Sequence, residues 1–134
     1  MTEPVWLSHS AVLAVHHMMI TRFGGSEGIR DEGLLDSALA RPQNLYHYEN
    51  CTDLPRLAAA YAAGLIQSHP FVDGNKRSGF IAAYMFLDLN GATLHADEVS
   101  ATSMTQSLAA SELDELAYAQ WISENIGNPK RTLP

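Results

Sequence analysis

The sequence has a single cysteine and few basic residues. Of its 134 residues only Cys51 is a cysteine, which excludes a disulfide framework and a cysteine-based zinc site. Eight Lys and Arg residues face fifteen Asp and Glu residues, for a formal net charge of −7. This balance argues against a general nucleic-acid binder and against a protein that binds anionic membranes. We therefore expect no direct nucleic-acid partner and no membrane partner, and any anion binding has to be local.

Long hydrophobic runs are also missing. The longest apolar stretches, 57–66 and 80–87, are far shorter than the roughly 20 residues that span a bilayer. The first residues, Met-Thr-Glu-Pro-Val-Trp, lack the basic region and apolar core of a signal peptide. These features predict a cytoplasmic protein. The length predicts one domain over 1–134, with 1–4 and 127–134 as frayed tails.

Apolar residues recur at helical spacing over most of the chain. The pattern and its flanking caps and prolines predict helices from the N-cap Ser8 to residue 23, then over about 31–41, 55–68, 75–89, 97–109 and 112–126. Pro42 is expected just past the end of the second helix. The 75–89 helix is apolar nearly all round, so it is predicted to be the buried centre of a compact all-α bundle.

The segment 45–53 does not read as helix. It is polar and aromatic, and Tyr46 and Tyr48 alternate within it. This pattern is compatible with a short β-hairpin or with an ordered loop.

The most informative stretch lies between the two most apolar helices. Pro70 ends the preceding helix at His69, Asp73-Gly74 is a turn pair, and Asn75 is suited to cap the next helix. Lys76 and Arg77 follow in the first helical turn, where cations oppose the helix macrodipole. Two of only eight basic residues therefore stand side by side at an unfavourable position.

That arrangement predicts an anion site. A helix N-terminus offers free N–H groups, Gly74 allows close approach of a ligand to the backbone, and the two cations attract phosphate. His69 exchanges a proton near neutral pH, as a general base must, and Asp73 offers a hard oxygen for Mg²⁺. Taken singly, a histidine before proline is commonly a loop residue and a Lys-Arg pair commonly a solvated face. Together they are the parts needed for phosphoryl or nucleotidyl transfer.

At these residues the sequence resembles the Fic/Doc superfamily. The family signature His-x-Phe-x-(Asp/Glu)-(Gly/Ala)-Asn-(Gly/Lys)-Arg stands here as His69-Pro70-Phe71-Val72-Asp73-Gly74-Asn75-Lys76-Arg77. Gly24-Gly25, the segment 28–42 and the size of the chain resemble the Doc branch, the "death on curing" toxins. The likeness covers roughly 5–126 and implies a Fic-like helical fold.

The branch decides which chemistry the resemblance implies. Fic enzymes move AMP from ATP to a protein hydroxyl, and their motif has glycine at the position of Lys76 and a second arginine at that of Phe80. Both departures are Doc-like. The Doc branch implies a Mg-ATP-dependent kinase that moves the γ-phosphate to a Ser/Thr hydroxyl of a translation factor of the elongation factor Tu type. AMP transfer remains the alternative.

The resemblance also implies a role for each motif residue. His69 is expected to deprotonate the target hydroxyl and Asp73 to hold Mg²⁺. Phe71 is structural, and the segment 45–53 is the expected target-docking flap, with Tyr46, Tyr48 and Asp53 as its candidate residues. The ATP phosphates are expected to lie against Gly74, Asn75, Lys76 and Arg77.

Two further hypotheses come from other classes. A non-catalytic module that binds nucleotide or phosphoprotein would keep the anion cradle, but the complete His69 and Asp73 pair argues against it. A metal hydrolase lacks further ligands at convincing spacing. His16-His17 is not read as a metal site either, because neighbours on a helix point about 100° apart, so one histidine is expected in the core and the other in solvent.

Regulation is expected to come from a separate protein. Many Fic proteins carry an inhibitory helix with Ser/Thr-x-x-x-Glu-(Gly/Asn). Here the residues four positions before Glu27, Glu49 and Glu124 are Phe23, Leu45 and Gln120, and none bears a hydroxyl. The resemblance therefore implies a small antitoxin that acts in trans and whose disordered tail folds on binding.

Overall fold

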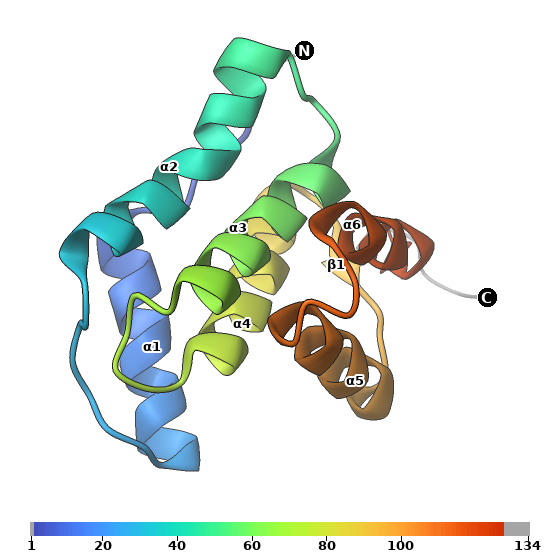
Figure 1. The fold of residues 1–134 in the computed structure, drawn as a ribbon. Coiled ribbons are helices and arrows are strands. Elements are labelled where there is room, and N and C mark those ends of the chain that lie inside the picture. The colour runs from blue at the N-terminus through green and yellow to red at the C-terminus, as the bar shows by residue number, and fades with distance from the viewer. Residues whose placement is uncertain (1, 128–134) are drawn as a thin grey trace.

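The computed structural model describes residues 2–127, which form an all-α bundle (Figure 1). Its helices and short strands are α1 (His9–Phe23), α2 (Glu32–Glu49), α3 (Leu54–Ser68), α4 (Asn75–Leu89), β1 (Thr93–Leu94), α5 (Glu98–Ala109), α6 (Glu115–Glu124) and β2 (Ile126–Gly127). None of the helices in this part of the chain is long and apolar enough to cross a bilayer.

Side-chain caps define four of the helix starts. Ser8, Asp31, Asp97 and Asp114 each accept a hydrogen bond from a backbone N–H in the first turn of α1, α2, α5 and α6. Such a cap stabilises a helix by about 1 kcal/mol. The predicted start of α6 at residue 112 is wrong, because the cap lies at Asp114.

The centre of the bundle is α3, not α4, and this corrects the prediction from the sequence. Residues 57–63 of α3 are all fully buried, whereas Tyr84 and Leu89 of α4 are exposed. In Figure 1 α3 runs through the middle of the molecule, and α2, α4, α5 and α6 all contact it. The many alanines of α3 explain the error, because small side chains let neighbouring helices approach closely from every side.

The second helix is longer than predicted. Pro42 lies inside α2, where a proline normally interrupts the hydrogen-bond ladder. Its ring is buried, and Leu39 and Leu45 on either side of it are buried as well. Burial of this apolar stripe holds the helix together past the proline, so α2 continues to Glu49.

The β-hairpin or loop predicted for 45–53 is wrong for residues 45–49, because they belong to α2. Tyr46 and Tyr48 lie in the last turns of α2, and Asp53 occupies the N-cap position of α3 without a side-chain cap. The ring of Tyr46 packs edge-on against Trp6, which accounts for an aromatic residue at this position. Strand pairing occurs elsewhere, between β1 and β2, where Thr93 pairs with Gly127. The predicted tail therefore does not begin at Gly127, and 128–134 lie outside the described residues.

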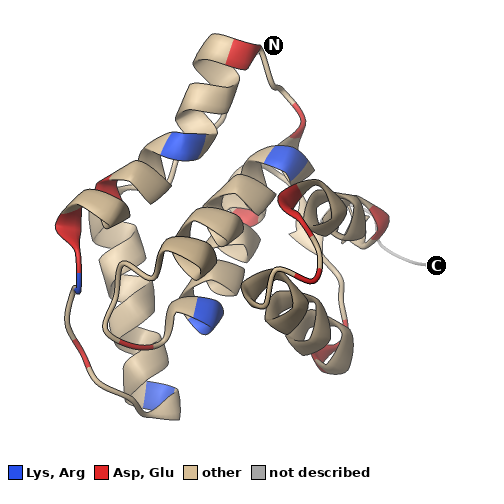
Figure 2. Ribbon diagram, in the orientation of Figure 1, with Lys and Arg blue, Asp and Glu red and all other residues tan. Residues whose placement is uncertain are grey.

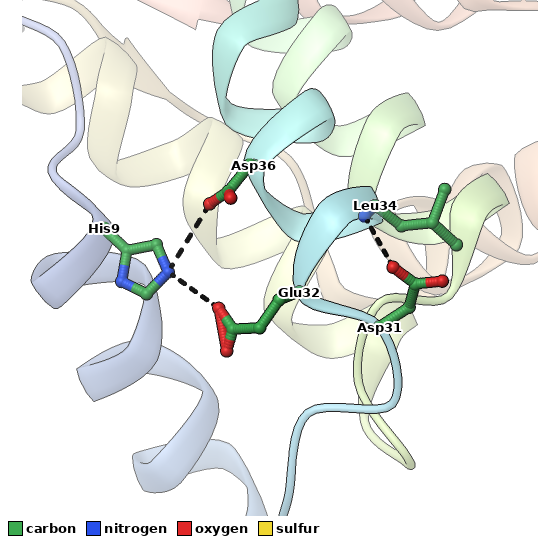
Figure 3. A network of polar contacts seen from close by, with 5 residues as sticks. All are labelled: His9, Asp31, Glu32, Leu34 and Asp36. Carbon is green, nitrogen blue, oxygen red and sulfur yellow. Dashed lines mark hydrogen bonds and ion pairs between the residues drawn. The ribbon is translucent and has the colours of Figure 1, made fainter.

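Polar contacts tie α1 and α2 together at their N-terminal ends. His9, the first residue of α1, has its Nε2 3.5 Å from Glu32 Oε1 and 3.9 Å from Asp36 Oδ1, as Figure 3 shows. The two carboxylates are four positions apart and so share one face of α2. The loop 24–31 therefore runs from the C-terminal end of α1 back to the N-terminal end of α2, where this cluster lies.

Candidate active site

The site is built on the loop 69–74 between α3 and α4. His69 ends α3 in a left-handed conformation, with φ 52° and ψ 57°, which is uncommon for a residue other than glycine. Pro70 is buried behind it, and the His69 side chain is exposed. An accessible imidazole on a backbone held in one uncommon conformation fits a positioned general base.

Asn75 fixes the shape of this loop. Its side-chain oxygen accepts from the Phe71 N–H at 3.0 Å, and its Nδ2 donates to the Phe71 carbonyl at 3.1 Å. The same Nδ2 lies 3.4 Å from His69 Nδ1. Asn75 is therefore not the N-cap that the sequence suggested. Gly74 takes that position, in the left-handed region at φ 77°, and the buried Asn75 amide holds the loop against itself.

Phe71 anchors the loop in the core and is 1% exposed. Its ring stacks on the imidazole of His16 from α1, with centroids 3.8 Å apart and planes 8° from parallel. His16 is buried and His17 exposed, as the helical geometry predicted. Residues 71 and 16 are far apart in the chain, and their contact shows that α1 packs directly against the loop 69–74.

Asp73 faces the loop 24–31 as well as the cleft. Its Oδ1 accepts from the Gly74 N–H at 2.9 Å, and its Oδ2 accepts from the Ser26 N–H at 3.3 Å. A Cβ atom at Gly25 would lie 2.7 Å from Oδ2, so only glycine fits beside this carboxylate. Sequence reasoning missed the contribution of Ser26 to the site, because it depends on the path of the α1–α2 loop.

The start of α4 is the basic part of the cleft. Lys76 and Arg77 are both exposed, and within residues 2–127 neither forms an ion pair with an acidic side chain. The Arg77 guanidinium lies 4.5 Å above the ring of Phe23 at the end of α1. Figure 2 shows this basic turn at the start of α4, apart from the acidic positions on α2 and on the loops around α6. With no side-chain cap, the first N–H groups of α4 are left for an anion.

One cleft of about 820 Å³ gathers nearly all of these residues. Its walls include six predicted site residues, namely His69, Asp73, Gly74, Asn75, Lys76 and Arg77. Phe23 of α1, Phe80 of α4 and Thr102 of α5 also line it, so the cleft has both apolar and polar walls beside the motif. A cleft of this size accommodates a nucleotide-sized ligand.

Four predicted site residues do not line this cleft: Phe71, which is buried in the core, and the three expected in the flap. Tyr46, Tyr48 and Asp53 precede α3, whereas His69 follows it. The 15 residues of α3 separate the two ends by about 22 Å along the helix axis. The structure therefore gives 45–53 no place beside the motif.

The donor set at Asp73 fits Mg²⁺ better than zinc. Among the described residues, the one group of three or more clustered His, Cys, Asp or Glu ligands is His9, Glu32 and Asp36, and Asp73 does not belong to it. A single carboxylate that leaves the remaining positions to water and substrate phosphates is how Mg²⁺ is commonly held in proteins. After its two N–H contacts, the Asp73 carboxylate still has lone pairs directed to solvent.

Comparison with known proteins agrees with the fold and the motif. The model of the Fic/DOC family matches residues 6–87. A protein of Escherichia phage P1 called "Protein kinase doc" is 30% identical over 122 residues, which is 91% of this chain and 96% of the phage protein. "Toxin Doc" of Mycolicibacterium smegmatis is 47% identical over 76 residues, or 56% of this chain. That match spans 58% of the mycobacterial protein.

This helical bundle places a histidine, an aspartate and an uncapped, basic helix start around one cleft, and these are the parts that a phosphoryl or nucleotidyl transferase needs. The chain belongs to the Fic/DOC family. The two relatives place it in the Doc toxin branch of that family.

Proposed function

We propose that this protein is the toxin of a toxin–antitoxin pair and that it phosphorylates a Ser or Thr hydroxyl of a translation factor, with Mg-ATP as donor. The observation that carries the proposal is the convergence of His69, Asp73 and the uncapped start of α4 on one cleft. The names of the relatives, a toxin and a protein kinase, favour the same activity.

Each group has a defined task in this reaction. The His69 imidazole takes the proton from the target hydroxyl, whose oxygen then forms a bond to the γ-phosphorus as the bond to the β,γ-bridging oxygen breaks. ADP leaves with that oxygen. Lys76, Arg77 and the first N–H groups of α4 stabilise the charge on the phosphate oxygens.

Mg²⁺ supplies charge neutralisation on the phosphates when it is bound, and Asp73 is the residue of this chain that would hold it. Asn75 acts on the loop and not on the nucleotide, since both ends of its amide are used by Phe71. This assignment differs from the phosphate-binding role expected from the sequence.

Two features favour γ-phosphate transfer over AMP transfer. Lys76 occupies the position at which AMP-transferring enzymes have glycine, and it adds a cation at the helix start. Phe80 occupies the position of their second arginine, and it lines the cleft as an apolar residue. The cleft thus has one cluster of cations, at the N-terminus of α4.

Restraint by a small antitoxin in trans is part of the proposal. Phe23 and Val72 both line the cleft, and they are 56% and 54% exposed. An apolar rim of this kind beside a basic helix start suits a partner segment with apolar and acidic side chains. Cytoplasmic location is proposed with it, because both ATP and a translation factor are found there.

Labelled ATP tests the reaction directly. The protein is incubated with Mg-ATP labelled at the α or the γ position and with purified elongation factor Tu, and the His69→Ala variant is the control. We expect label on the target from the γ position only, and none with the variant. Label from the α position would establish AMP transfer instead. Transfer that persists in His69→Ala would exclude catalysis by this base.

A further inference from the structure

The C-terminal end of α3 lacks the donors that normally satisfy a helix end. The last four carbonyls of a helix have no partner in the helix, and the N–H groups just beyond the end commonly bond to them. Here the residue after His69 is Pro70, which has no N–H. The next two N–H groups are used elsewhere, by the Asn75 side chain and by the Gly28 carbonyl.

Arg30 supplies the missing donors from the loop 24–31. Its Nε donates to the His69 carbonyl at 2.7 Å, and its Nη2 donates to the Ser68 carbonyl at 2.8 Å. The planar guanidinium presents these two donors in a fixed fork, which matches two successive carbonyls. Its positive charge also lies at the negative end of the helix dipole.

The main chain around Arg30 grips the same loop. The N–H groups of Arg30 and Asp31 both donate to the Pro70 carbonyl, at 2.7 and 3.0 Å. Ile29 pairs with Phe71 in an antiparallel bridge. The side chain of Arg30 is thus aimed at His69 by backbone contacts that do not depend on the side chain itself.

We propose that Arg30 is a positioning residue for the catalytic base. By holding the Ser68 and His69 carbonyls, which flank the His69 Cα, it keeps His69 in its left-handed conformation and keeps the imidazole in the cleft. Arg30 touches neither the cleft nor its basic helix start, and so it acts only through His69. This inference rests on the transfer reaction proposed above.

Substitution of Arg30 separates positioning from nucleotide binding. Arg30→Ala keeps every backbone contact of the loop, and we expect kcat to fall about 10- to 100-fold while KM for Mg-ATP is unchanged. Arg30→Lys retains one charged donor, and its kcat is expected between those of Arg30→Ala and the unsubstituted protein. Millimolar guanidinium is expected to restore part of the lost kcat in Arg30→Ala only.

Arg41→Ala is the matched control. Arg41 pairs with the half-buried Glu115 on the face of α2 toward α6, away from the motif, so its loss removes one arginine and some stability without touching His69. We expect its kcat to be unchanged. Unfolding midpoints in urea are measured for all variants, and kcat is compared under conditions where each is fully folded.

The outcomes distinguish this inference from the proposed function. If His69→Ala abolishes transfer while Arg30→Ala keeps normal kcat, the positioning role is wrong and the transfer reaction stands. A kcat that falls equally in Arg30→Ala and Arg41→Ala overturns the role too, because it reflects stability alone. If His69→Ala transfers normally, the proposed function itself fails.

Discussion

The imidazole of His16 lies face to face on the ring of Phe71, with the two ring centroids 3.8 Å apart. Its Nε2 is 2.8 Å from the Asp73 carbonyl oxygen, and since that oxygen only accepts, Nε2 carries the proton that is donated. The His16 side chain of α1 thus contacts two residues of the motif, Phe71 and Asp73.

The neighbouring histidines of α1 provide a matched pair of variants. His16→Ala removes the stack and the bond to Asp73, and we expect a loss of about 1–3 kcal/mol in the free energy of unfolding and at least a tenfold loss in kcat. His17→Ala removes an exposed side chain that pairs with Glu27, and its effect is expected within about 0.5 kcal/mol. Urea unfolding and transfer assays measure both. Equal losses would contradict the supporting role of His16.

Asp73 is expected to determine the requirement for Mg²⁺. Asp73→Asn keeps the size of the side chain and an oxygen that accepts from Gly74, but it removes the charge. We expect transfer to fall about 100-fold and to recover partly when the Mg²⁺ concentration is raised, since the substitution weakens a ligand and leaves the fold intact. Asp36→Asn, on α2 and outside the cleft, is the control. A Mg²⁺ dependence unchanged in Asp73→Asn would remove this aspartate from the metal site.

Close packing of α4 on α3 predicts a severe effect at Gly79. A Cβ atom there would lie 2.6 Å from Ile66 Cγ1 and 3.1 Å from the Ala62 carbonyl oxygen. Gly79→Ala is therefore expected to destabilise the fold by about 1–3 kcal/mol, even though alanine favours the helix. Gly33→Ala, in the first turn of α2, is expected to be neutral or stabilising by up to about 1 kcal/mol. Thermal and urea unfolding compare the two variants. Equal stabilities would contradict the prediction, because they would show that the contact between α3 and α4 accommodates an added methyl group.

Two buried tyrosines predict a loss of stability in alkali. Burial raises the pKa of Tyr61 and of Tyr118 to about 12, although the Leu7 N–H and the Thr105 hydroxyl partly oppose this. In the unfolded chain both phenols ionise near their ordinary pKa of 10.0. Their contribution is therefore complete below about pH 10 and is lost as the pH rises toward about 12.

Ultraviolet absorbance of the phenolate and urea midpoints taken along the same pH series test this prediction. Tyr118→Phe is expected to make stability less dependent on pH in that range, whereas Tyr48→Phe, on an exposed side chain, changes nothing. Ionisation of all five tyrosines near pH 10 without unfolding would contradict it.

Local signals predicted the helix limits well where a cap or a proline marks them. The bounds of α4 agree with the prediction at both ends, and Ser8, Asp97 and Ser68 lie where they were expected. Prediction failed where packing opposed the local signal. Pro42 and the alternating tyrosines argued against helix, but burial of Leu45 and the contact of Tyr46 with Trp6 outweighed both.

The sequence by itself determined the motif from His69 to Arg77 and the class of chemistry that we propose for it. A short contiguous stretch supplies the histidine, the carboxylate and the basic helix start, and these need only one loop and one helix turn to come together. The low number of basic residues made the Lys76-Arg77 pair stand out within a chain of net charge −7.

Only the tertiary structure decided what holds that motif in place and which helix is central. Arg30 and His16 are 39 and 57 positions away from the atoms they bond, and no periodicity connects residues so far apart. Their roles follow from the close packing of α1 and the loop 24–31 against residues 69–73. The central position of α3 likewise depends on how many neighbours a helix of small residues can contact, a property of the packed bundle.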